Sequence, residues 1–127
     1  MSRKKVFVFG TENDPVAWEV ADKLESRMRG VEFIKTSNPD NIIGIGAGED
    51  LVIMDAVRGI KEPRFLSIND LKENTAMTTH DIDLGMTLLL LHKTGRINEA
   101  RIIGIPLDAE VDDELLSSLK SMFGWML

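Results

Sequence analysis

Apolar runs of strand length recur along the chain and predict a sheet. The strongest runs cover residues 5–9, 51–54 and 102–105, and weaker runs cover 31–35 and 64–68. A run without polar positions is typical of a strand covered on both faces, because a solvated face would place a polar residue at every second position. The runs therefore predict parallel strands buried between helices.

Three further segments predict helices that cover the sheet. The first and the last are amphipathic, and the middle one is apolar on most sides, so it is expected to be largely covered. They span residues 16–28, about 83–94 and about 112–124, and the first two are expected to close at Gly30 and Gly95. Strands that alternate with helices connect by right-handed crossovers. The predicted fold class is α/β, a three-layer αβα sandwich with a mostly parallel, about five-stranded sheet.

Composition and charge narrow the classes of function. The chain has 127 residues, of which 43% are hydrophobic and 28% charged, and this predicts a single domain over residues 1–127. The net charge of −6 argues against binding to nucleic acid or an anionic membrane, and favours basic partners. The apolar run after the basic N-terminus is too short for a signal peptide, so we expect a cytoplasmic protein without membrane insertion. The absence of cysteine excludes thiol nucleophiles and Cys-ligated metals.

Potential metal ligands lie next to the predicted elements. Glu12 and Asp14 are in the loop after the first strand. Asp55 directly follows the run at 51–54, and His80 comes just before the second helix. Ligands of open α/β sheets bind beyond the carboxyl ends of the strands, so these side chains are expected to converge. Carboxylates with an imidazole suit a divalent first-row metal such as nickel, manganese, iron or zinc.

Each candidate also has a purely structural explanation. Asp14 fits a helix N-cap with Pro15 as the first helical residue. Asp55 fits a carboxylate at a strand end that accepts hydrogen bonds from N–H groups of a loop. His80 fits a residue of the first turn of the second helix. His92, late in the second helix, fits an exposed residue whose positive charge interacts favourably with the negative end of the helix dipole.

Several motifs together resemble the hydrogenase maturation endopeptidases. They are Phe9-Gly10 followed by an acidic loop, Val-Ile-Met-Asp-Ala-Val at 52–57, Thr79-His80 before a leucine-rich helix, and Ile-Gly-Ile-Pro at 103–106. The resemblance runs from about Lys5 to Phe123. Residues 79–84 are most similar to the branch that serves formate hydrogenlyase and archaeal energy-converting hydrogenases.

The resemblance implies both a function and a site. Such endopeptidases remove a C-terminal extension from the precursor of the nickel-iron hydrogenase large subunit after nickel insertion. The implied catalytic and metal-binding residues are Asp14, Asp55 and His80, which would recognise nickel presented by the precursor. No seryl or cysteinyl nucleophile is implied, and the oligomeric state is left open.

The first loop departs from the family pattern. It is about three residues shorter and lacks the later glycines, so the choice between Glu12 and Asp14 as the first ligand stays open, although Asp14 better fits the start of the helix. A loop with fewer glycines is stiffer. We therefore also consider a non-catalytic homologue that binds a metal or partner.

A response-regulator receiver domain phosphorylated on Asp55 is the alternative from another class. The length, the strand–helix alternation and the acidic first loop all suit it. However, receivers carry a lysine before the proline that follows the last strand, and here Ile105 precedes Pro106. His80 also has no role in a receiver.

Overall fold

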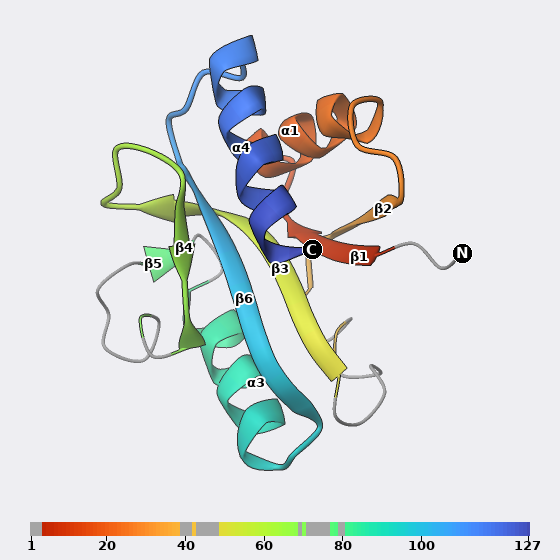
Figure 1. Ribbon diagram of the computed structural model, residues 1–127. Helices are drawn as coiled ribbons and strands as arrows, with labels where there is room; N and C mark the ends of the chain where they lie inside the picture. Colours follow the sequence, from red (N-terminus) through yellow and green to blue (C-terminus); the bar gives the residue numbers. More distant parts are fainter. Residues whose placement is uncertain (1–3, 39–41, 43–48, 69, 71–76, 79–80) are drawn as a thin grey trace.

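The structure is a computed structural model that describes residues 4–38, 42, 49–68, 70, 77–78 and 81–127 (Figure 1). The strands are β1 (Lys4–Phe9), β2 (Val31–Thr36), β3 (Glu49–Arg58), β4 (Arg64–Leu66), β5 (Met77–Thr78) and β6 (Ile97–Pro106). The helices are α1 (Val16–Glu25), α3 (Asp81–Lys93) and α4 (Asp113–Met126). No helix among the described residues is long and apolar enough to cross a membrane.

The strands form one mostly parallel sheet. Along the sheet the order is β2-β1-β3-β6-β4, and the short strand β5 pairs with β3. Strands β2, β1, β3 and β6 are mutually parallel, whereas β4 runs antiparallel to β6 and β5 runs antiparallel to β3. The parallel strands therefore bring their carboxyl ends to one edge of the sheet.

Helices cover both faces of the sheet, which confirms the predicted three layers. Helices α1 and α4 pack on one face, where Leu24 and Leu119 join a buried cluster with Val8 and Ile103 of the sheet. Helix α3 covers the opposite face, where Leu88 is part of a second buried cluster (Figure 1). Burial on both faces explains why the central strands carry uninterrupted apolar runs.

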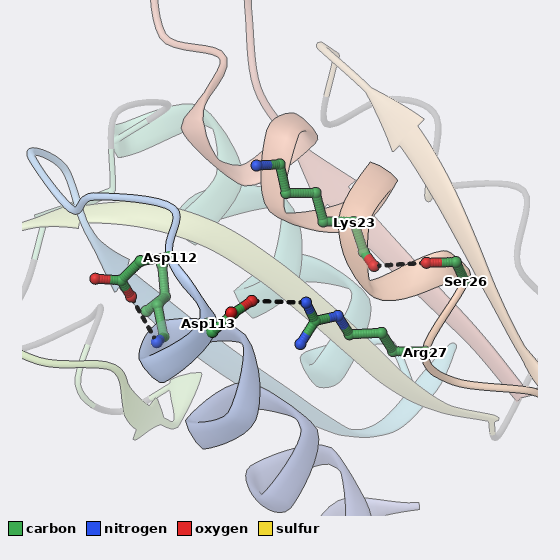
Figure 2. Close-up of polar contacts among 6 residues, drawn as sticks. Lys23, Ser26, Arg27, Asp112 and Asp113 are labelled. Carbon is green, nitrogen blue, oxygen red and sulfur yellow. Dashed lines mark hydrogen bonds and ion pairs between the residues drawn. The ribbon is translucent and has the colours of Figure 1, made fainter.

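The contact between α1 and α4 combines apolar packing with exposed polar contacts. Arg27, just after α1, forms an exposed ion pair of 2.8 Å with Asp113 at the start of α4 (Figure 2). Within α4 itself, the N-cap residue Asp112 accepts a hydrogen bond of 2.9 Å from the Leu115 N–H. An exposed ion pair contributes little, whereas an N-cap contributes about 1 kcal/mol. The buried side chains below these contacts therefore determine how the two helices pack.

Two helix ends were predicted differently. Helix α1 begins at Val16 with Pro15 at the N-cap position, and no side chain caps it, so the prediction of Asp14 as N-cap was wrong. The turn that precedes the helix uses the Asp14 backbone instead. Helix α1 ends at Glu25, and Gly30, with a φ of 82°, lies in the following turn just before β2.

The end of α3 was predicted correctly. Gly95 has a φ of 75°, a backbone conformation that favours glycine. Its N–H donates to the His92 carbonyl at 3.2 Å, and the Arg96 N–H donates to the Leu91 carbonyl at 2.9 Å. This pair of hydrogen bonds is a Schellman motif, which closes the helix at the predicted glycine.

A tryptophan of α1 holds the loop between β1 and α1 against the sheet. The Trp18 indole N–H donates to the Val8 carbonyl of β1 at 3.1 Å. A Cβ atom at Gly10 would lie 2.9 Å from the indole ring. Glycine is therefore required at this position, because any side chain would push Trp18 from its hydrogen bond.

We predict that Gly10→Ala lowers the free energy of unfolding by about 1–3 kcal/mol, the usual cost of overpacking. Gly124→Ala is the matched control, because no atom lies within 4 Å of a Cβ added at this position in α4. It should stabilise the protein by about 0.5–1 kcal/mol, since alanine favours a helix over glycine. Urea unfolding followed by tryptophan fluorescence measures both. Equal stabilities for Gly10→Ala and wild type would contradict the role of Trp18.

Candidate functional site

A cleft of about 580 Å³ opens at the carboxyl edge of the parallel strands. Its walls come from the loop after β1, the end of β3 and the segment between β6 and α4. Its lining residues are Thr11, Asn13, Asp14, Pro15, Val16, Glu19, Arg58, Leu107, Asp108 and Ala109. This is the edge at which open α/β sheets bind ligands.

The first loop forms a tight turn that aims Asp14 at the cleft. The Thr11 N–H donates to the Asp14 carbonyl and the Asp14 N–H donates to the Thr11 carbonyl, both at 3.1 Å. The Asp14 N–H also contacts the Thr11 hydroxyl oxygen at 3.0 Å. Asp14 Oδ2 is buried and has no hydrogen-bond partner among the described residues. By contrast, Glu12 is exposed and does not line the cleft.

The Asp55 carboxyl group lies inside the protein, within β3 itself. The prediction that the strand ends before Asp55 was wrong, since β3 continues to Arg58. The strand is longer because Ala56 and Val57 are buried and pair with Ile105 and Pro106 of β6. Asp55 is 0% exposed. A carboxylate at this depth is costly unless hydrogen bonds, a cation or a proton neutralise it.

Strand alternation places Asp55 on the face of the sheet that α3 covers. Ile53 and Val57, two residues to either side of it, both belong to the buried cluster on that face. Its partner in the β6 register is Gly104, where an added Cβ would lie 2.9 Å from Val57 Cγ2. The glycine therefore leaves room for the Val57 side chain beside the buried acid.

The structure brings Asp14 and Asp55 to the same edge but not into the same cleft. Val8 pairs with Met54, so Asp55 is level with Phe9, the last residue of β1. Asp55 is nevertheless absent from the lining of the cleft that holds Asp14. His80 lies outside the described residues, and among those described no group of three or more His, Cys, Asp or Glu side chains could hold a metal.

Three charged residues of the cleft, Glu19 of α1, Arg58 and Asp108, were not predicted from the sequence as site residues. Arg58 is the last residue of β3, and Asp108 follows β6. Ala56 and Val57 continue the apolar run, so the predicted strand could have been extended through Val57. Arg58 would then have been recognised as a residue at the carboxyl end of this strand. Asp108 gives no such signal, since its place in the cleft depends on how the segment after β6 folds back beside the first loop.

Among the residues lining this cleft that the structure describes, carboxylates outnumber cations. Asp14, Glu19 and Asp108 line it together with one basic residue, Arg58. An acid-lined cleft favours cationic ligands such as metal ions or basic side chains.

Solved structures of other proteins have a fold similar to that of this chain. No protein-family model and no curated protein sequence matches the chain. Among solved structures, the chain is similar to the hydrogenase 3 maturation protease, with a TM-score of 0.69 and 21% sequence identity over 97% of this chain and 91% of that one. It is also similar to an uncharacterized protein from Wolinella succinogenes, with a TM-score of 0.61 and 18% identity over 98% of this chain and 99% of that one. The chain therefore has the fold of the hydrogenase 3 maturation protease.

Proposed function

We propose that this protein is an endopeptidase that removes the C-terminal extension of a nickel-iron hydrogenase large-subunit precursor after nickel insertion. The observation that carries the proposal is the buried, unpartnered Asp14 Oδ2 at the carboxyl edge of a fold shared with a hydrogenase maturation protease. A carboxylate oxygen kept from water without a hydrogen bond from the described residues suits a group that completes its contacts when a metal binds.

Asp14 is the better candidate for the first nickel ligand. It lines the cleft, whereas Glu12 is exposed on the outer side of the turn. The prediction of Asp14 as a helix cap has also failed, so a structural explanation of its side chain is weaker.

Asp55 and His80 complete the proposed site. Strand β5 runs antiparallel to β3 and pairs Thr78 with Val57, which is two residues from Asp55 in the sequence. Helix α3, which covers the face that carries Asp55, starts at Asp81. His80 joins these two described segments in the sequence, and this supports its assignment as the third ligand.

The proposed role of the three ligands is to recognise a precursor that already carries nickel. Two carboxylates and an imidazole suit a divalent first-row metal and leave positions for the precursor's own ligands. Shared coordination would hold the extension across the acid-lined cleft. Water then hydrolyses the peptide bond, with the metal as Lewis acid or a carboxylate as general base.

The structure does not fit the receiver alternative. Receiver folds have the strand order 2-1-3-4-5, whereas the last strand in sequence, β6, is inserted here between β3 and β4. Strand β4 is also antiparallel.

We predict that the purified protein cleaves a nickel-loaded large-subunit precursor and leaves the nickel-free precursor intact. Intact-mass measurement of the large subunit before and after incubation detects loss of the extension. An unchanged mass for the loaded precursor, under conditions where another maturation protease cleaves it, would contradict the endopeptidase function. Binding of the loaded precursor without cleavage would instead support the non-catalytic homologue.

Removal of single ligands tests the proposed site. We predict that Asp14→Asn and His80→Ala each lower the cleavage rate by more than about a hundredfold. Substitution of a residue that only hydrogen-bonds to a metal ligand already lowers metal affinity or activity by about 10–100-fold. His92→Ala is the matched control, because His92 is an exposed residue in the last turn of α3. Its rate should equal that of wild type. A full rate for Asp14→Asn would remove Asp14 from the site.

A further inference from the structure

Among the described residues that line the acidic cleft, Arg58 is the one basic side chain. Its backbone is fixed on β3 by neighbouring segments: Arg58 pairs with Met77 of β5, and the Leu107 N–H donates to the Val57 carbonyl at 3.2 Å. The arginine therefore projects from a strand held on both sides rather than from a flexible loop.

The Arg58 guanidinium is available to a ligand. Among the described residues it forms no ion pair and no hydrogen bond, although three carboxylates line the same cleft. An arginine remains protonated at every physiological pH and presents five N–H donors in a fixed plane. A group of this kind at a cleft wall suits an oxygen that carries, or acquires, negative charge.

Peptide hydrolysis creates such an oxygen in the cleft. As the water oxygen bonds to the scissile carbonyl carbon, the π electron pair moves onto the carbonyl oxygen, and one water proton passes to a carboxylate of the cleft. The pair returns when the C–N bond breaks, and the proton then leaves on the departing amine. Asp14, Glu19 and Asp108 disfavour the transient negative oxygen, so an additional cation close to that oxygen would stabilise it.

We propose that Arg58 is a further catalytic residue, which donates hydrogen bonds to the scissile carbonyl oxygen and stabilises the oxyanion. The inference rests on the proposed endopeptidase function and adds a group that the Asp14, Asp55 and His80 site does not supply. It uses the charge of Arg58 in the transition state, so the arginine should affect kcat more than KM.

The test compares Arg58→Met and Arg58→Lys with wild type on the nickel-loaded large-subunit precursor. Arg58→Met should lower kcat by roughly a hundredfold to a thousandfold, as loss of an oxyanion donor does elsewhere, and leave KM within a few-fold. Arg58→Lys should keep part of the rate, because the charge remains while the planar donor set is lost. Added guanidinium ion, below concentrations that unfold the protein, should restore part of the rate of Arg58→Met.

Lys61→Met is the matched control. Lys61 is an exposed cation that lines the adjacent depression rather than this cleft, so its removal changes the net charge equally. Its kcat should equal that of wild type. Circular dichroism of Arg58→Met should match wild type, because the Arg58 side chain is exposed.

The outcomes separate this inference from the function on which it rests. A wild-type protein that cleaves, together with an Arg58→Met variant of equal kcat, overturns the role of Arg58 alone. An equal loss in Lys61→Met, a change confined to KM, or a loss that guanidinium does not relieve also overturns it. A wild-type protein that leaves the precursor intact overturns the endopeptidase function and the role of Arg58 with it.

Discussion

The parallel pairing of β1, β3 and β6 is the constraint on which the rest of the structure depends. It aligns the ends of strands that are far apart in the sequence, from Phe9 to Pro106, at one edge of the sheet. Burial of both faces under α1, α4 and α3 stabilises this pairing, because each central strand removes apolar side chains from water on two sides. The cleft exists because the loops that leave these strand ends must pass over the same edge.

The two described acids of the proposed site are held in different ways. Asp55 is part of β3 and 0% exposed, so its position is as rigid as the core around it. Asp14 depends on a turn closed by Thr11 and on the Trp18 indole that packs over Gly10. The buried acid and the loop acid are therefore held by separate parts of the fold.

Charge gives the cleft its chemical character. Three carboxylates attract a cation or a metal-bearing ligand, and the same carboxylates oppose the negative oxygen that forms when a peptide bond is hydrolysed. Arg58, which has no ion pair or hydrogen bond with the described residues, is carried by a strand on the wall of the same cleft.

The sequence by itself determined the layers of the protein. Its apolar runs predicted strands within β1, β2 and β6. Its apolar positions between the strands, together with Gly95, predicted the helices. Both predictions were possible because the spacing of apolar residues is a local property of the chain. The tertiary structure alone decided that β4 is antiparallel and that Asp14 faces the cleft rather than capping α1. Asp108 joins the cleft for the same reason. Each of these features depends on which distant segment packs against the residue, and a pattern along one strand or helix carries no information about that neighbour.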